Sequence, residues 1–157
     1  MNCHGLDTEK QVLFYENEFY PLSNFSSFCV DWVGYRFHTA EAAYHWSKFG
    51  GYYDIKLAIR EATSAHEAMK IAHKNEAYVR KDWDYIKDAV MLDILRAKVA
   101  QHDYVLKKLL ETGDRELVEN SWRDDYWGWG ENKDGKNNLG KLWMIVRDEI
   151  KALTPEK

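Results

Sequence analysis

Seven consecutive residues, Asp124 to Gly130, combine two carboxylates, three large aromatic side chains and two glycines. Carboxylates accept protons in hydrolytic reactions, and aromatic rings offer flat surfaces against which a heterocycle or a sugar can pack. Glycines allow the backbone to come close to a ligand. We therefore interpret this segment as a candidate binding and catalytic loop.

Three side chains further upstream, Glu41, His45 and Lys48, form a second group that could do chemistry. Their spacing of i, i+4 and i+7 places them on one face of a helix. Two interpretations are open: a solvated face held by a ladder of polar pairs, or a catalytic face. We predict that this group and the segment 124–130 face one pocket.

A turn rich in glycine and asparagine, Gly135 to Gly140, precedes the last predicted helix. Backbone N–H groups at such a helix start can bind an anion, so a phosphate site is one interpretation of this turn. Neither a Walker A pattern nor G-x-G-x-x-G is present, which argues against an NTPase or a dinucleotide-binding fold. His38 and His45 lack a third ligand at metal spacing, so we expect no metal site.

The elements that position these residues are expected to be mainly helical with a small N-terminal β element, which is an α+β fold class. Thr39, Ser64 and Asp82 have the side chains of helix N-caps, and alternation around Gly34 predicts a hairpin. The predicted helices span about 40–49, 65–75, 83–101, 104–111 and 139–153, the predicted strands 12–15, 29–33 and 35–37, and the predicted loop 121–138.

Apolar residues recur at helical spacing on the two longest predicted helices, and they predict the buried faces. The first stripe consists of Ile86, Val90, Ile94 and Ala97, and the second consists of Leu142, Ile145, Val146 and Ile150.

The 157 residues suit one domain, for which we predict the bounds 12–153 after a flexible N-terminus at 1–11. The net charge of −4 and the lack of a basic block argue against tight binding to a long nucleic-acid backbone. The aromatic share of 15% fits either an aromatic core or a pocket built from rings. Cys3 and Cys29 form no CxxC pair, and no apolar run reaches about 18 residues, so we expect a cytoplasmic protein without a membrane partner.

Short motifs occur in a fixed order between Phe14 and Ile150. The first are Phe14-Tyr15, Ser23-Asn24-Phe25, Gly34 to Phe37, Thr39-Ala40-Glu41, Tyr44, Lys48-Phe49, Arg80-Lys81-Asp82-Trp83, Met91 and Ala97-Lys98. The later ones are Leu109 to Gly113, Leu117-Val118-Glu119, Asp124, Trp127-Gly128, Gly135-Lys136-Asn137, Leu139-Gly140, Met144 and Arg147. In this order and spacing the chain resembles the YbiA/NADAR family. Ala43 stands where that family often has His, and Trp46 where it more commonly has Gln.

The resemblance implies a fold of helices with a small sheet, and an N-glycosidase that hydrolyses the bond between a ribose anomeric carbon and an exocyclic nitrogen. The implied substrates are phosphoribosylamino-pyrimidine intermediates of riboflavin synthesis or ADP-ribosylated guanine, including guanine in single-stranded DNA. No cofactor is implied.

Within this resemblance Glu41 is the expected acid/base carboxylate and Asp124 the second carboxylate, near the ribose. Lys48 either captures the sugar as a Schiff base or pairs with Glu41 or a phosphate. The expected substrate-binding residues are Asn24, Tyr44, Arg80, Trp83, Trp127, Gly128 and Asn137. The alternative from another class is a non-catalytic module that binds ADP-ribose or NAD, and a helical interaction domain is a third interpretation.

Overall fold

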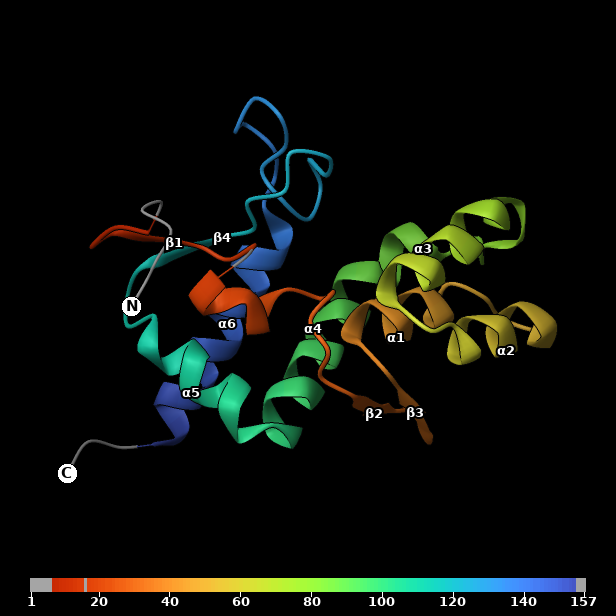
Figure 1. Cartoon of the computed structure of the whole chain (residues 1–157), viewed down its shortest axis with the longest axis horizontal. Helices are drawn as coiled ribbons and strands as arrows, with labels where there is room; N and C mark the ends of the chain where they lie inside the picture. Colours follow the sequence, from red (N-terminus) through yellow and green to blue (C-terminus); the bar gives the residue numbers. More distant parts are fainter. Residues whose placement is uncertain (1–6, 16, 155–157) are drawn as a thin grey trace. The chain divides into compact units, whose positions relative to one another are not determined.

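The computed structural model of the chain describes residues 7–15 and 17–154. The chain forms two compact units, each with its own internal contacts (Figure 1). One unit comprises Asn24–His102, and the other joins the residues up to Ser23 with those from Asp103 onward. We describe each unit by itself. Residues 1–6 of the expected flexible N-terminus lie outside the described residues.

The unit of residues 24–102 is a helical cluster with one hairpin. Strands β2 (Val30–Trp32) and β3 (Tyr35–Phe37) pair antiparallel. The predicted hairpin is confirmed: its turn residues Val33 and Gly34 have φ values of 51° and 85°, as a tight two-residue turn requires. The helices of this unit are α1 (Ala40–Ser47), α2 (Tyr53–Glu61), α3 (Ala65–Lys74) and α4 (Trp83–Gln101), with a short 3-10 turn at Glu76–Tyr78.

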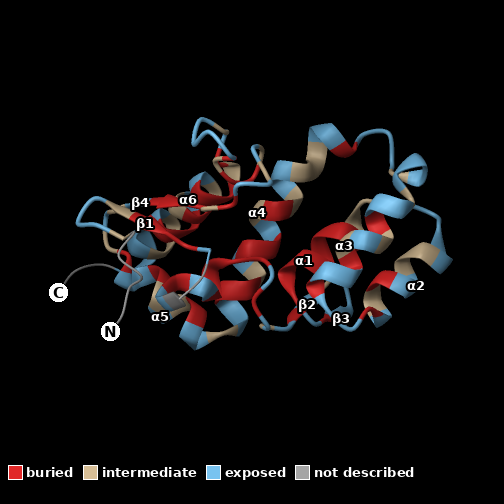
Figure 2. Ribbon diagram, turned by 45° about the horizontal axis from the view of Figure 1, so that its top comes forward, coloured by how far each residue is buried: buried red, intermediate tan, exposed pale blue. Residues whose placement is uncertain are grey.

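Helix α1 is the most buried element of this unit. It packs against α2, α3 and α4 and contacts both strands of the hairpin. Its residues from Ala40 to Trp46 are all buried, and Figure 2 shows the helix in the colour of buried residues. The hydroxyl of Thr39 accepts the backbone N–H of Ala42 at 3.1 Å, so the predicted N-cap is confirmed. The cap fixes where α1 begins and therefore which face Glu41 occupies.

Helix α4 buries a different face from the one that we predicted. Of the predicted stripe, only Ile94 is buried. The buried residues are Trp83, Met91, Ile94, Leu95, Lys98 and Val99. Met91, Leu95 and Lys98 each follow a predicted position by one residue, which corresponds to a rotation of about 100° around the helix. The spacing of apolar residues could not reveal this buried face, because the face includes Lys98.

The second unit contains a pair of short parallel strands and two helices. Strand β1 (Gln11–Leu13) pairs with β4 (Glu116–Val118), with Val12 opposite Leu117. The first strand was expected near this position, whereas β4 was not. The helices are α5 (Asp103–Glu111) and α6 (Asn138–Leu153), and a 3-10 segment spans Asn17–Leu22. The segment between β4 and α6 has no regular element, as predicted for 121–138.

Helix α6 is anchored through two buried side chains. The indole N–H of Trp143 donates to the carbonyl of Leu22 at 2.9 Å, and the guanidinium of Arg147 donates to the Thr112 hydroxyl and the Arg115 carbonyl. Of the predicted stripe, Val146 is buried but Ile145 is 44% exposed. The indole and the guanidinium occupy the inner face, which turns Ile145 toward solvent.

The fold class is mainly helical with short strand pairs, as expected. Each helix in the described part of the chain is either too short or too polar to traverse a lipid bilayer.

Candidate active site

Glu41 and His45 form a buried pair on α1. The Nε2 atom of His45 lies 2.6 Å from Oε2 of Glu41, and the two residues are 3% and 9% exposed respectively. The backbone N–H of Glu41 donates to the carbonyl of Asn24 at 3.0 Å. The solvated-face interpretation is therefore wrong for these two side chains. A buried carboxylate with a defined hydrogen-bond partner is a typical feature of acid–base sites.

We predicted His45 on the same helix face as Glu41 but assigned it no role in the site. The i, i+4 spacing from Glu41 already placed the two side chains together, so the signal was present in the sequence. Its Nδ1 atom is buried and has no hydrogen-bond partner among the described residues. The ring of His73 on α3 lies edge-on to it, with centroids 5.9 Å apart.

A pocket of about 360 Å³ lies in the same unit and is lined by His73, whose ring contacts that of His45; Glu41 and His45 themselves are not among its lining residues. Three predicted site residues line it: Lys48, Arg80 and Trp83. The remaining lining residues are Ala72, His73, Glu76, Val79, Lys81 and Asp84. Its volume is in the range of small-molecule sites. The cations that line it can attract a phosphate, and the indole offers a wall for a heterocycle.

Tyr44 and Trp83 make the aromatic wall next to this pocket. Their ring centroids are 5.2 Å apart, and both residues are buried. The ammonium of Lys48 lies 5.2 Å from the centroid of the Tyr44 ring. Lys48 also accepts, through its carbonyl, the backbone N–H of Arg80 at 2.8 Å. These contacts fix the end of α1 against the start of α4.

The guanidinium of Arg80 is paired with the carboxylate of Asp82, at 2.6 and 2.9 Å. The pair raises the pKa of Arg80 and lowers that of Asp82, with the hydrogen bond as the main cause in each case. Asp82 therefore precedes α4 without the side-chain cap that we expected from it.

His73 carries a shifted pKa in this pocket. Partial burial of its ring holds the pKa below the usual 6.5, and the charge of Lys48 acts in the same direction, as a charge on His45 would. Glu41 and Glu76 oppose the shift. His73 is therefore neutral at pH 7, where one ring nitrogen can donate a hydrogen bond to a ligand and the other can accept one.

Asn24 is buried against the first turn of α1. Its side-chain N–H donates to the sulfur of Met91 at 3.4 Å, whereas its Oδ1 atom has no partner among the described residues. Its backbone carbonyl holds Glu41. This backbone hydrogen bond links Asn24, a predicted binding residue, to Glu41.

Asp124 organises the loop of the other unit. Its Oδ1 atom accepts the backbone N–H groups of Tyr126 and Trp127 at 2.9 and 2.8 Å. Trp127 is 9% exposed and contacts the ring of Tyr126. A Cβ atom on Gly128 would lie 2.9 Å from the carbonyl oxygens of Asp124 and Glu119, so the tight loop needs glycine here.

Asn137 holds this loop against β4. Its Oδ1 accepts the N–H of Glu119, and its Nδ2 donates to the carbonyl of Leu117, both at 2.9 Å. Its φ of 51° is left-handed, which asparagine tolerates well. Since both ends of the amide are engaged, the structure gives Asn137 a role in shaping the loop.

The expected anion site at the start of α6 is not formed. The backbone N–H groups of residues 136–139 all donate to carbonyls of the loop 125–128, at 2.8 to 3.1 Å. These donors are satisfied within the chain, so they are not available to a phosphate. We correct our prediction for this turn accordingly.

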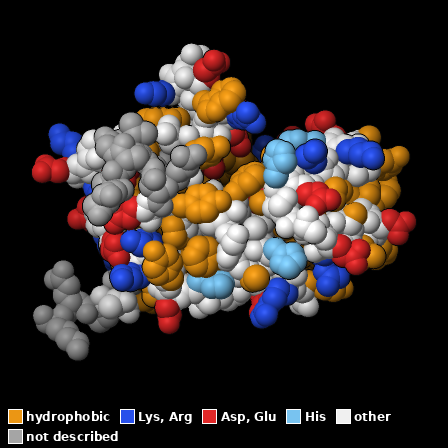
Figure 3. Space-filling model, in the orientation of Figure 1, with side chains coloured by type: hydrophobic (Ala, Val, Ile, Leu, Met, Phe, Trp, Pro, Cys, Tyr) orange, Lys and Arg blue, Asp and Glu red, His pale blue; other side chains and the backbone are white. Residues whose placement is uncertain are grey.

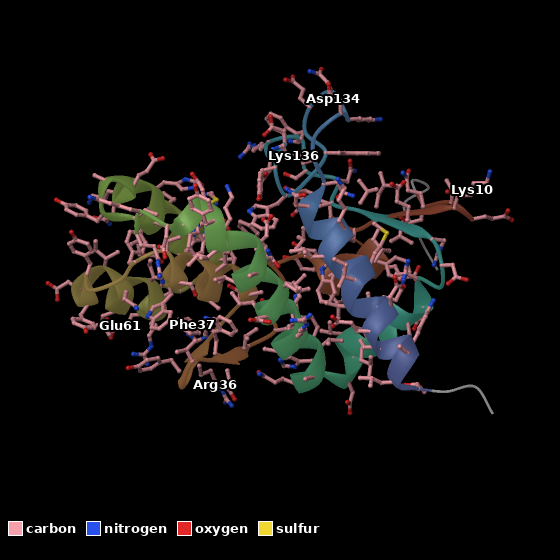
Figure 4. All side chains as sticks on the ribbon, turned by 180° about the vertical axis from the view of Figure 1, so that it is seen from behind. Lys10, Arg36, Phe37, Glu61, Asp134 and Lys136 are labelled. Carbon is pink, nitrogen blue, oxygen red and sulfur yellow. The ribbon has the colours of Figure 1, made fainter. Side chains whose placement is uncertain are left out.

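A shallow pocket of about 320 Å³ lies on the same loop, lined by Asp125, Tyr126, Asp134, Gly135 and Lys136. Figure 4 labels Asp134 and Lys136 on the loop that precedes α6. The lining residues are neighbours of Asp124 and Trp127 in the chain.

Glu41 and Lys48 belong to one unit and Asp124 and Trp127 to the other. That both groups face one pocket stays a prediction. Positive and negative side chains are interspersed on the face that Figure 3 shows. Among the described residues, no group of three or more His, Cys, Asp or Glu side chains could hold a metal ion.

Comparison with known proteins gives a consistent result. The model of the NADAR domain family matches residues 13–151. The N-glycosidase Npun_R5314 of Nostoc punctiforme is 38% identical over 133 residues, which cover 83% of this chain and 85% of that protein. The riboflavin biosynthesis protein VVA0006 of Vibrio vulnificus is 33% identical over 94% of this chain but only 40% of its own length.

A solved structure has the same fold. The NMR structure of the Escherichia coli protein YbiA superimposes with a TM-score of 0.84 and 30% identity, covering 97% of this chain and 92% of that one.

Proposed function

The chain belongs to the NADAR domain family, and from this premise we propose that it hydrolyses the bond between a ribose anomeric carbon and an exocyclic amino nitrogen of a guanine-like or pyrimidine heterocycle. Relatives of the chain are named N-glycosidases, and the chain is a hydrolase that acts on N-glycosyl compounds. The observation that carries the finer proposal is the buried Glu41–His45 pair, which contacts His73, a residue that lines a pocket together with Lys48, Arg80 and Trp83.

Glu41 is the proposed acid/base carboxylate. In the hydrolysis, the C1′–N bond breaks with its electron pair going to nitrogen, and the sugar passes through an oxocarbenium-like state. The oxygen of water adds to C1′, and Glu41 takes the proton that this water loses. Glu41 passes this proton to the departing nitrogen, which regenerates the carboxylate and leaves the free sugar and the free amine as products.

Lys48 offers a covalent variant of the same reaction. When the ribose ring opens, the amino-linked carbon becomes an imine; the neutral amine of Lys48 adds to it and expels the heterocyclic amine. Water then hydrolyses the lysine imine and releases the sugar. Borohydride reduces such an imine to a stable adduct, so a peptide that carries the sugar on Lys48 is the expected product. Lys70→Met, at an exposed position of α3 outside the pocket, should retain the adduct, and Lys48→Met should lose it; an adduct that persists in Lys48→Met would contradict this role.

Asp124 is the proposed second carboxylate, and its expected partners are the ribose hydroxyls. Trp127, Tyr44 and Trp83 would supply aromatic surfaces for the heterocycle. Asn24 and Arg80 would orient the sugar or its phosphate, and Gly128 and Asn137 would keep the loop in shape. The bond between Asp124 and the N–H groups of its own loop supports this assignment, since it holds the carboxylate in place.

The substrate is proposed to carry a phosphate on its ribose. Lys48, Arg80 and Lys81 bring three cationic side chains to one pocket, and Glu76 and Asp84 oppose them. Both candidate substrate classes, the phosphoribosylamino-pyrimidines and ADP-ribosylated guanine in free or single-stranded form, meet this requirement. The name of the Vibrio relative supports the first class.

Incubation with both classes tests the proposal, with release of the free amino heterocycle measured by mass spectrometry. Release of ribose 5-phosphate assigns the first class, and release of ADP-ribose assigns the second. Tight binding of ADP-ribose or NAD with no release from either substrate would instead favour the non-catalytic module.

A further inference from the structure

We propose that His45 is a positioning residue that donates a hydrogen bond to Glu41 and keeps it ionised, so that Glu41 begins the reaction as a base. This inference rests on the proposed function, and it adds a residue to the site. It also narrows the role of Glu41, which the family resemblance leaves open between acid and base.

The first observation is the geometry of the pair. A separation of 2.6 Å between Nε2 and Oε2 leaves room for one shared proton. The side chains of His45 and Glu41 are only 4% and 12% exposed, so bulk water competes little for their hydrogen bond. In such surroundings a hydrogen bond is stronger than at the surface, and the position of its proton decides the charge on the carboxylate.

The second observation concerns the other nitrogen of the ring. Nδ1 of His45 is buried and has no partner among the described residues. A proton on Nδ1 would be a buried donor without an acceptor, and unpaired buried N–H groups are rarer in protein interiors than incompletely paired acceptors. Both the imidazolium and the Nδ1–H tautomer carry such a proton. The neutral Nε2–H tautomer does not, and we assign it on this ground.

The Nε2–H tautomer determines the state of Glu41. Its single proton points at Oε2, so Glu41 must accept the bond, and a carboxylate accepts it better than a carboxylic acid. A protonated Glu41 that donated to Nε2 would require the proton on Nδ1 that the surroundings disfavour. Glu41 is therefore ionised and oriented before the substrate arrives.

The surroundings of the pair agree with a neutral imidazole. The ring of His73 lies edge-on at 5.9 Å, and the ring of Tyr44 lies at 5.2 Å. The rings of His73 and Tyr44 are both neutral, so neither supplies a charge that could hold Glu41 ionised in place of the hydrogen bond from His45.

The role makes a specific prediction for enzyme kinetics. In His45→Phe the ring shape is kept and the donor is lost, so kcat should fall by about 10-fold or more while KM changes little. In His45→Gln a side-chain N–H can reach the same acceptor, so most of the rate should return. Combined with Glu41→Gln, the phenylalanine substitution should have no further effect, because His45 acts only through Glu41. Independent, additive losses, or a change confined to KM, would overturn the proposal.

Nitrogen-15 NMR of the histidine rings tests the same claim without a variant or a substrate. The shifts of the two ring nitrogens identify the tautomer, and we expect a neutral His45 with its proton on Nε2 at about pH 7. An imidazolium or an Nδ1–H ring would refute the assignment. This result stands whether or not the wild-type protein releases a heterocycle, so failure of the proposed function and failure of this inference are distinguishable.

Discussion

Replacing Lys98 by methionine should stabilise the unit of residues 24–102 near neutral pH. Lys98 on α4 is fully buried, with its ammonium nitrogen 2.9 Å from the hydroxyl of Ser26 and 5.5 Å from the centroid of the Phe28 ring. Burial lowers the pKa of this lysine from 10.5 to about 7. Methionine has a similar length and needs no solvation of a charge.

The magnitude follows from the shift in pKa. Between about pH 7 and pH 10.5 the unfolded chain holds a proton on Lys98 that the folded chain does not, so the free energy of unfolding increases with pH in this window. The slope is at most about 1.4 kcal/mol per pH unit, and the full window corresponds to roughly 5 kcal/mol. Lys98→Met removes this dependence.

Urea unfolding of the wild type and the variant, followed by intrinsic fluorescence, measures the effect. From about pH 7 to about pH 9.5 the free energy of unfolding of the wild type should rise by roughly 3 kcal/mol more than that of Lys98→Met. Lys70→Met, at an exposed position of α3, is the control and should keep the wild-type dependence. Parallel curves for the wild type and Lys98→Met would refute the reasoning.

Two further predictions concern the loop and the pocket. Gly128→Ala places a Cβ atom 2.9 Å from two carbonyl oxygens, so thermal unfolding should show that the free energy of unfolding falls by about 1–3 kcal/mol. Gly50→Ala is the control and should be nearly neutral, because nothing lies within 4 Å of its Cβ position. Equal effects of the two substitutions would contradict the close packing of this loop. The pKa of His73, measured by NMR titration, should lie below 6.5, rise in Lys48→Met and fall in Glu41→Gln, and an unchanged value in both variants would show that neither charge acts on it.

The sequence was sufficient for features that depend on a few neighbouring residues. The hairpin around Gly34 and the cap at Thr39 were predicted because local backbone geometry and a side-chain hydroxyl decide them. Helix α2 was missed because it is only nine residues long and buries only Ile59, so the i, i+4 spacing of Ile55 and Ile59 is a short signal. Strand β4 was missed because three residues carry little pattern and its partner β1 lies about a hundred positions earlier in the chain.

The candidate site was predicted in part for the same reason. Spacing placed Glu41, His45 and Lys48 on one face, but only the packing of α2, α3 and α4 around α1 shows that the first two are buried. The anion site at the start of α6 was predicted wrongly because the acceptors of its N–H groups lie in a loop with no sequence signature. Buried Lys98 could not be predicted, since an apolar pattern excludes it from the buried face.

The most direct measurement is the rate at which the protein releases a free amino heterocycle from its ribosylated form, compared between the wild type and Glu41→Gln. Glu61→Gln, an exposed position on α2 in the same unit, serves as the matched control. We predict a loss of about 10²-fold or more for Glu41→Gln and none for the control. Equal rates in all three proteins would contradict the role of the buried Glu41–His45 pair.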